Sequence, residues 1–428
     1  MRKRIVLVKP PETSRLNFGT FSLAVLAGAV RHIADITLVD ATDLDRDEAA
    51  REVIAENPDI IGVTVMSEES VGPASCFVRS LKNSLKQTPR PPTIIAGGHG
   101  ASMHPLPLLH SGAAAVVYGE GEKTMRQVIE EGIVPGAKGL VCQGKNGTVR
   151  GKPQEPVYPL DSLEKPARDL MPASENVFLM ETSRGCPHSC RFCETTRFYG
   201  REWRPFSPGR IAEEVHELVE KHRAWVIHFA DDNFAADPDR VLRICDELQK
   251  VSLPAVILAS ARADDLASRP VLLKEMSDAR IRRITVGVET LDPLTAGKAG
   301  KSVSPGIYKE VFRKMREHDI FSVASFIVGL PGESPEIRKN SVALALDAAP
   351  DVAHFLPFLP LAGTPYANER KPGKADQQDI RDSSIFSTAF RNHPATIARL
   401  KEAVDRGGIR GLFAEKTLQK GYTGMNRQ

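Results

Sequence analysis

The residues of this chain with the clearest capacity for chemistry are three cysteines within eight positions, Cys186, Cys190 and Cys193. Thiolates separated by three and then two residues fit around one small inorganic cluster from a single loop. Because three cysteines bind only three irons of a four-iron cluster, the fourth iron remains open to another ligand. The segment therefore predicts an iron–sulfur cluster with one open position.

A zinc site that uses His188 as a fourth ligand is the main alternative. Structural zinc sites usually draw a second ligand pair from elsewhere in the chain, and no such pair stands out here. The remaining cysteines, Cys76, Cys142 and Cys245, are isolated and mostly flanked by apolar residues, so we expect them in hydrophobic cores.

Length and composition define the class of protein. The 428 residues suggest two or three domains, and 41% hydrophobic with 26% charged residues supports packed cores. A balance of 57 Lys+Arg against 54 Asp+Glu argues against nucleic-acid binding by a strong overall field. The apolar run Ile5–Val8 ends too early for a signal peptide, and no run approaches about 18 apolar residues. We expect a cytoplasmic protein with reduced thiols and no membrane span.

Residues 1–135 alternate short apolar runs with helical stretches. The predicted strands are Ile5–Val8, Ile36–Val39, Ile60–Val65, Thr93–Ala96 and Ala114–Tyr118. The predicted helices are Phe21–Arg31, Asp47–Glu56, Gly72–Lys86 and Glu122–Glu131. Continuous apolar strands separated by helices indicate an α/β domain with a doubly wound parallel sheet. Such sheets bind ligands at the carboxyl ends of their strands.

Unusual residues collect after three of these strands. They are Thr64, Ser67 and Ser70 after the third, Gly97-Gly98-His99-Gly100-Ala101-Ser102 after the fourth, and Gly119-Glu120-Gly121 after the fifth. Glycines let a backbone approach a flat ligand, and hydroxyls and amides can bond its periphery. Ordinary turn chemistry is the alternative for any one of these segments. Three segments on one sheet edge favour a ligand site.

The chain then changes character twice. Residues 136–173 are polar and proline-rich and predict a hairpin followed by a linker. Residues 174–366 again alternate strands and helices and predict a partial (β/α)6 barrel, whose chemistry belongs at the carboxyl ends of its strands. Its strands are expected at Val177–Met180, Val226–Phe229, Ala255–Ala259, Ile284–Val288, Phe321–Val328 and Val352–Leu356. Residues 367–428 form a short helical or tail region.

The cysteine motif, with an aromatic residue before its last cysteine, resembles the radical S-adenosylmethionine (SAM) superfamily. Further matches follow the later strands, at Phe229-Ala-Asp-Asp-Asn-Phe234, Gly287-Val-Glu-Thr290, Gly329-Leu-Pro-Gly-Glu333 and Pro360-Leu-Ala-Gly-Thr-Pro365. Together with the N-terminal domain, the chain resembles the subfamily that carries a cobalamin (B12)-binding domain before the radical SAM barrel.

The resemblance implies roles for individual residues. Cys186, Cys190 and Cys193 would hold a [4Fe-4S] cluster whose open iron binds SAM, and reductive cleavage would give a 5′-deoxyadenosyl radical. Phe192 would contact the adenine of SAM, and Glu289 and Gly329 would also contact SAM. Lys301 would pair with the SAM carboxylate, and Arg262 is the alternative residue for that contact. Alternatively, Glu289 caps the helix after Asp292 and Lys301 is solvated.

The resemblance does not assign the roles of two acidic residues or the lower ligand of the cobalt. Asp231 and Asp232 either cap the helix near Asp237 or point into the barrel, the arrangement that we favour for at least one of them. No Asp-x-His-x-x-Gly sequence supplies a histidine to cobalt, and His99 is the nearest candidate. The lower face of the cobalt is then expected to be unliganded or water-bound, with Thr64, Ser67, Gly97, Gly98, His99, Gly119, Glu120 and Gly121 holding the corrin.

The leading functional hypothesis is a cobalamin-dependent radical SAM methylase that acts on an unactivated carbon of a small-molecule or lipid substrate. Its electron donor would be a flavodoxin or ferredoxin. The same cofactors could instead serve an oxidative cyclisation or rearrangement, and a non-catalytic cluster and SAM binder is a further alternative. A tRNA methylthiotransferase fits less well, because the N-terminal domain lacks three cysteines for a second cluster.

Overall fold

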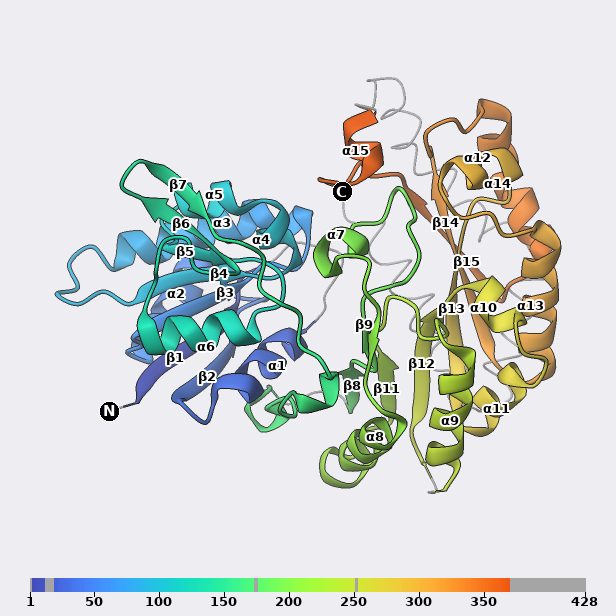
Figure 1. Ribbon diagram of the computed structural model, residues 1–428, viewed down its shortest axis with the longest axis horizontal. Coiled ribbons are helices and arrows are strands. Elements are labelled where there is room, and N and C mark those ends of the chain that lie inside the picture. Colours follow the sequence, from blue (N-terminus) through green and yellow to red (C-terminus); the bar gives the residue numbers. More distant parts are fainter. Residues whose placement is uncertain (1, 12–18, 173–175, 251–252, 370–428) are drawn as a thin grey trace. The chain divides into compact units, whose positions relative to one another are not determined.

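The computed structural model describes residues 2–11, 19–172, 176–250 and 253–369 (Figure 1). The chain divides into two compact units, Met1–Glu175 and a second that begins at Asn176. Each unit is built around its own sheet. The predicted tail, residues 367–428, lies outside the described residues beyond Glu369.

The first unit contains a seven-stranded sheet in the order β2-β1-β3-β4-β5-β6-β7. The first five strands pair in parallel, as predicted, while the hairpin of β6 and β7 joins the same sheet antiparallel through β5. The strands are β1 (Lys3–Lys9), β2 (Ala34–Asp40), β3 (Ile60–Thr64), β4 (Thr93–Gly97), β5 (Ala115–Val117), β6 (Leu140–Gly144) and β7 (Gly147–Arg150). This strand order is that of a doubly wound sheet.

Helices cover both faces of this sheet. Residues of α2 and α3, such as Val53 and Phe77, share one core with Val6 and Val63, and residues of α1 and α6 share the other with Ile5. The helices are α1 (Phe21–Val30), α2 (Arg46–Ala55), α3 (Glu68–Ser84), α4 (His99–Met103), α5 (Pro105–His110) and α6 (Glu122–Glu131). Two 3₁₀ turns, Leu160–Ser162 and Arg168–Leu170, lie in the proline-rich linker.

The second unit contains a six-stranded parallel sheet in the order β15-β14-β13-β12-β11-β8. Its strands are β8 (Val177–Met180), β11 (Val226–Phe229), β12 (Val256–Ala261), β13 (Ile281–Glu289), β14 (Phe321–Val328) and β15 (Val352–Pro357). A separate short pair is formed by β9 (Ser183–Arg184) and β10 (Arg204–Pro205). The sheet is open, with β8 and β15 at its edges, which confirms the predicted α/β class and its six parallel strands.

The helices of the second unit are α7 (Thr195–Tyr199), α8 (Pro208–His222), α9 (Pro238–Gln249), α10 (Ala263–Ala267), α11 (Leu272–Asp278), α12 (Pro293–Lys298), α13 (Pro305–Glu317), α14 (Pro335–Ala348) and α15 (Pro365–Glu369). Of these, α9, α11, α13 and α14 lie on one side of the sheet (Figure 1). Ser207, Asp237, Asp292 and Ser334 each cap a helix that begins with proline. Proline is favoured in the first helical turn because its missing N–H has no intrahelical partner there.

Among the described residues, no helix combines the length and apolar character needed to cross a membrane.

Candidate active site

The three cysteines lie in the loop between β9 and α7, which follows the first strand of the second unit. Gly185 precedes this loop with φ +82°, and a Cβ there would stand 2.0 Å from the carbonyl oxygen of Glu202. Only glycine fits this close approach, so Gly185 fixes the direction in which the chain enters the loop.

Asp231, just after β11, holds the start of the loop. Its carboxylate accepts hydrogen bonds from the backbone N–H and the hydroxyl of Thr182, at 3.3 and 2.9 Å, and from the hydroxyl of Ser183. The side chain is fully buried, and burial raises its pKa while the Ser183 hydroxyl and the Arg240 cation act in the opposite direction. Asp231 is therefore a support for the segment that leads to the cysteines.

Asp232 holds the two ends of the cysteine loop together. It accepts a hydrogen bond of 2.7 Å from the hydroxyl of Thr195 and another from the backbone of Gly185. Burial raises its pKa, and both hydrogen bonds oppose that change. Neither aspartate caps α9, because Asp237 itself accepts from the Arg240 N–H at 3.0 Å, so the capping alternative is wrong.

We expect Asp231→Ala to lower the free energy of unfolding by about 2–4 kcal/mol. The substitution leaves the buried donors of Thr182 and Ser183 without their acceptor and removes the negative charge near the Arg240 cation. Urea denaturation of the full chain measures this loss. Asp239→Ala is the matched control, because Asp239 is exposed and pairs with the exposed Arg269, and we expect little change. Equal losses in the two variants would contradict the role of Asp231.

Cys190 lies beside two cations. The Arg262 guanidinium donates to its sulfur at 3.7 Å, and the positive charges of Lys301 and Arg262 both favour its thiolate. Gly300 packs against this part of the loop, where a Cβ would lie 3.2 Å from the Ser189 carbonyl oxygen. The turn after α12 therefore brings Lys301 to the cysteine loop, and the end of β12 brings Arg262.

Burial dominates the ionisation of all three thiols. It raises the pKa of Cys186 to about 11 and also raises the pKa values of Cys190 and Cys193, although hydrogen bonds from Thr195 lower the latter. Metal binding deprotonates thiols, so cluster assembly must release protons here. A sheltered set of three thiols with cations beside it suits a cluster that also binds an anionic ligand.

Glu289 and Lys301 form a buried ion pair. Lys301 Nζ lies 2.8 Å from Glu289 Oε1, and the two side chains are 7% and 11% exposed. Glu289 has φ +63° at an irregularity in the pairing of β13 with β14, an uncommon conformation for a residue with a side chain. Asp292, which accepts from the Thr295 N–H, caps α12. The alternatives of a capping Glu289 and a solvated Lys301 are therefore wrong.

Arg262, the alternative to Lys301 as the residue that binds the carboxylate of SAM, is paired with Asp264. Its Nη2 lies 2.7 Å from Asp264 Oδ2, and its Nε lies 3.0 Å from Oδ1. Burial lowers the pKa of this guanidinium, but the Asp264 interactions outweigh it and the net shift is upward. Arg262 and Lys301 thus both lie near Cys190, and each carries its own carboxylate partner.

Phe192, expected at the adenine, and Gly329, expected at the adenosyl group of SAM, lie in one neighbourhood. Phe192 packs against an apolar cluster that contains Ala299, Leu330, Phe358 and Tyr366. Gly329 has φ +87°, and its N–H donates to the carboxylate of Glu333. Glycine at 329 therefore serves the turn that follows β14.

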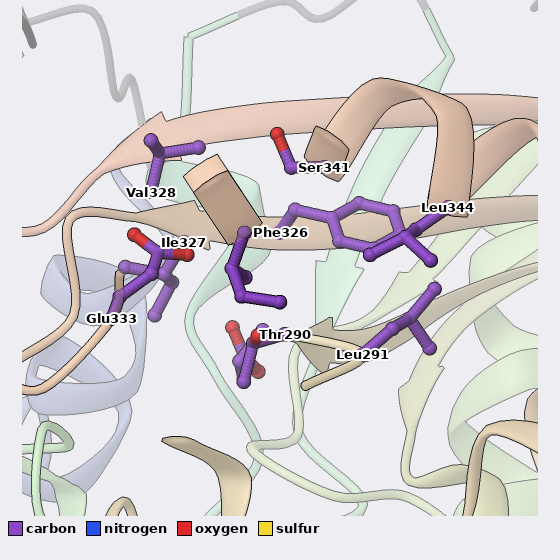
Figure 2. A pocket seen from close by; sticks show the side chains of 10 residues that line it. Thr290, Leu291, Phe326, Ile327, Val328, Glu333, Ser341 and Leu344 are labelled. Carbon is purple, nitrogen blue, oxygen red and sulfur yellow. The ribbon is translucent and has the colours of Figure 1, made fainter. Parts of the chain in front are cut away.

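A small pocket opens where β13 and β14 end, beside α14 (Figure 2). It encloses about 250 Å³, counting the space at its mouth, which is below the roughly 300–1,000 Å³ of common small-molecule sites. The pocket alone therefore does not identify a cofactor site. Its lining comprises Glu289, Thr290, Leu291, Phe326, Ile327, Val328, Glu333, Ile337, Ser341 and Leu344.

His188 faces a carboxylate. Its Nε2 lies 3.4 Å from Asp265 Oδ2, and the Asn233 amide donates to the same oxygen at 2.7 Å. Throughout the described ranges, no three His, Cys, Asp or Glu side chains converge as a single metal ion would require. Cysteines that each bind a different iron of a cluster need not converge in that way.

The sequence interpretation missed Asn233 and Asp265 as supports of the cysteine loop. Asn233 is fully buried, and its amide links the Arg262 backbone N–H to Asp265. The signal was present, since Asn233 follows Asp231-Asp232 after a buried strand and Asp265 follows Arg262. An Asn at a strand end is also common in turns, so the type alone did not identify it.

The three polar and glycine-rich segments that follow β3, β4 and β5, which we call the rims of these strands, are connected by hydrogen bonds. The Gly100 N–H donates to Val65 at 2.9 Å, the Ser102 hydroxyl donates to Gly98 at 2.7 Å, and the Gly119 N–H donates to Ser102 at 3.0 Å. The residues after β3, β4 and β5 therefore meet at one sheet edge. Thr64 and Gly97 are register partners at the ends of β3 and β4.

Several of the residues predicted to contact cobalamin instead stabilise the local fold of these segments. A Cβ at Gly98 or Gly100 would lie 2.6 or 2.2 Å from a backbone oxygen of the β3 rim, so these glycines allow the rims to pack. Ser67 caps α3, accepting from the Ser70 N–H, and Glu120 accepts from the Val157 N–H at 3.2 Å. Gly119, with φ +74°, and Gly121 leave more space.

His99 is the first residue of α4. Burial lowers its pKa to about 4, so the imidazole is neutral at pH 7.

The partly buried His99 predicts a loss of stability in acid. Its pKa of about 4 in the folded state lies below the unfolded value of 6.5, so its contribution is complete above pH 6.5 and lost as the pH falls towards 4. Between pH 7 and pH 5 this amounts to about 2 kcal/mol. We expect His99→Asn to remove that part of the pH dependence in urea denaturation. Parallel pH profiles for the two proteins would contradict it.

Each of the two units matches the profile of a known protein family. The radical SAM superfamily profile matches residues 180–345, and the B12-binding domain profile matches residues 12–129. The structure of the radical SAM methyltransferase TsrM from Kitasatospora setae is similar over 86% of this chain and 75% of that chain, with a TM-score of 0.72 and 20% identity. At that identity the likeness concerns the fold.

Three relatives show how widely activities vary around this sequence. The uncharacterized methyltransferase PH0819 of Pyrococcus horikoshii is 27% identical, over 84% of this chain and 82% of its own. An anaerobic magnesium-protoporphyrin IX monomethyl ester cyclase of Rubrivivax gelatinosus is 26% identical, over 79% of this chain but only 64% of its own. The hopanoid C-3 methylase of Methylococcus capsulatus is 26% identical, over 87% and 72%.

The two profiles and the fold agree with the resemblance carried by the cysteine motif and the strand-end residues. The chain therefore belongs to the radical SAM superfamily, in the group with an N-terminal B12-binding domain, and is an enzyme whose cofactors are a [4Fe-4S] cluster, SAM and cobalamin.

Proposed function

We propose that this enzyme transfers a methyl group to an unactivated carbon of a small-molecule or lipid substrate. The observation that carries the proposal is the presence, on one chain, of a B12-binding domain and of a cysteine loop flanked by Arg262 and Lys301. The methyltransferase of Pyrococcus horikoshii and the hopanoid C-3 methylase support transfer of a methyl group over other outcomes.

In this proposal Cys186, Cys190 and Cys193 hold the cluster. When bound, the cluster supplies the electron that cleaves SAM. Lys301 and Arg262 offer positive charge near Cys190 for the SAM carboxylate, as salt-bridged donors whose positions Glu289 and Asp264 fix.

The remaining SAM contacts are proposed from their neighbourhood. The apolar cluster around Phe192 and Leu330 provides a surface for the adenine, and the turn at Gly329 lets the backbone approach it. Asp231 and Asp232 act as positioning residues, since they hold the two ends of the cysteine loop.

Cobalamin is proposed to lie on the rim at the ends of β3, β4 and β5. Thr64, Gly97, Gly119 and Gly121 are the residues of this rim that we expect at the corrin. His99 is neutral near pH 7, because its pKa is about 4, and so is able to present an imidazole nitrogen to cobalt or to a corrin side chain. Ser67, Gly98 and Glu120 contribute mainly by shaping the rim.

Oxidative cyclisation is the second candidate, favoured by the similarity to the cyclase of Rubrivivax gelatinosus. We further propose that a flavodoxin or ferredoxin supplies the electron, and that the enzyme works in the cytoplasm, where thiols stay reduced.

Product analysis tests the function. The cluster is reconstituted anaerobically, and the enzyme is given cobalamin, dithionite, trideuteromethyl-SAM and a small-molecule extract of its source cells. Methylation predicts S-adenosylhomocysteine together with 5′-deoxyadenosine, and a product that carries the labelled methyl group. Cyclisation predicts 5′-deoxyadenosine without S-adenosylhomocysteine. Neither nucleoside above the level of a control without reductant would overturn both candidates.

A further inference from the structure

The inner face of the second sheet carries a charge that the proposed SAM site does not use. Along β13, Ile284, Val286 and Val288 are buried, and they alternate with residues that are only partly covered. We call the side on which the partly covered residues lie the inner face. It comprises Arg283, Thr285, Gly287 and Glu289 on this strand.

Glu289 and Lys301 lie on this same face. A Cβ placed on Gly287 would stand 2.6 Å from both Glu289 Oε1 and Lys301 Nζ, so the ion pair covers the inner side of Gly287. The charges of Lys301 and Glu289 act in turn on Cys190. The inner face of β13 therefore leads from Arg283 towards the cysteine loop.

Arg283 is a partly buried cation. Its Nε is buried and has no hydrogen-bond partner among the described residues, and no described carboxylate forms an ion pair with the guanidinium. Burial lowers its pKa. Arginine stays protonated in proteins, so the positive charge persists without compensation from the described part of the chain.

Two histidines lie on the same face of the sheet as this cation. His228 of β11 is the register partner of Leu258, which is in turn the partner of Arg283. His354 of β15 pairs with Ser325, the partner of Gly287. Register partners in a parallel sheet point to the same face.

Both histidines are neutral near pH 7. Burial and then the Arg283 charge lower the pKa of His228 to about 4 and also lower that of His354. A neutral imidazole can donate one hydrogen bond without adding to the positive charge. Arg283 with His228 and His354 therefore offers one cation and two neutral donors on one face.

We propose that Arg283, with His228 and His354, binds an anionic oxygen group of the substrate, a carboxylate or a phosphate. A fork of guanidinium N–H groups matches both anions. This inference rests on the proposed function, because it assigns the substrate to the same face as the cysteine loop. An anion would give the partly buried guanidinium the partner that the described residues do not provide.

The position of Arg283 also constrains the substrate's shape. Arg283 precedes Gly287 by four residues, which is about 13 Å along a strand. The anionic group would therefore be separated by several bonds from a carbon that reacts near the ion pair. Thr285 lies between these two levels of the sheet, and its register partners Ser260 and Val323 would contact the carbon skeleton with it.

Thermal unfolding of the reconstituted full-length enzyme tests the anion site. The probes are inorganic phosphate and succinate, with chloride at the same ionic strength as the reference. At about five times its dissociation constant, a bound anion should raise Tm by about 2–4 °C. A larger rise with phosphate identifies a phosphate-type group, and a larger rise with succinate identifies a carboxylate.

Arg283→Gln should raise Tm in chloride, because it removes an uncompensated charge, and should abolish the rise with either anion. Arg282→Gln is the matched control, since Arg282 lies one residue away and bonds to Ser277 at 2.8 Å. It should keep the rise. No rise in the wild type, or a rise that survives in Arg283→Gln, overturns the anion site.

A failure of the proposed function can be distinguished from a failure of the proposed anion site. Wild-type enzyme that cleaves SAM but shows no anion-dependent rise overturns the anion site and leaves the function standing. Wild-type enzyme that does not cleave SAM under reduction overturns the proposed function, whatever the anions do to Tm.

Discussion

Cys193→Ala is expected to abolish cluster binding and to reduce SAM cleavage by at least about 100-fold. Substitutions of groups that merely support metal ligands already cost about 10–100-fold, and loss of a ligand costs more. Cys193 is also held in place by Thr195, through which the loop is tied to Asp232. Iron content after anaerobic reconstitution and the yield of 5′-deoxyadenosine measure the two losses.

Cys76→Ala is the matched control for this experiment. Cys76 is a free cysteine of α3 in the first unit, partly buried and outside the three-cysteine loop. The variant loses a thiol of the same kind, so its iron content and SAM cleavage should stay near the wild-type values. Wild-type iron content in Cys193→Ala would show that the cluster is held by other residues.

The parallel strands of both sheets could be predicted from sequence because their signal is local. The apolar runs at Ile60–Thr64 and Phe321–Val328 are bounded by helical stretches, and proline after a serine or aspartate marks several helix starts. The cysteine motif is local as well, since one loop supplies all three thiols. These features need no knowledge of which segments meet in space.

The contacts of the site residues could not be predicted, because they join distant segments. Glu289 pairs with Lys301 only because Gly287 has no side chain beneath them and the pairing of β13 is irregular. Gly98 and Gly100 were interpreted as room for a ligand, but they accommodate a backbone more than thirty residues earlier, at Val65 and Ser67. The spacing of residues along the chain predicts neither this ion pair nor these backbone contacts.

Asp231 and Asp232 show the same limit in a different form. Their position after a strand was compatible with a helix cap, although an inward-facing side chain was favoured for at least one of them. The structure distinguishes these options because Asp237 caps α9. The two carboxylates are then free to bond Thr182 and Thr195, which lie about forty to fifty residues away in sequence. A residue type can thus be recognised locally while its partner depends on the fold.

Lys301→Met is expected to lower the free energy of unfolding by about 3–5 kcal/mol. Methionine keeps most of the side-chain volume but leaves Glu289 without its ion-pair partner, and removal of one member of a buried pair is strongly destabilising. Loss of the lysine should also weaken SAM binding, since its charge faces Cys190. Urea denaturation measures the first effect, and equilibrium binding of SAM to the reconstituted enzyme measures the second.

The double variant Lys301→Met with Glu289→Gln separates these two effects. Removing the stranded carboxylate should restore most of the lost stability, because the buried site then holds no net charge. SAM affinity should not return, since neither new side chain provides a cation for its carboxylate. Recovery of both stability and affinity would show that Lys301 acts only by neutralising Glu289, and Arg262, which lies 3.7 Å from the Cys190 sulfur, would then be the residue that binds the carboxylate.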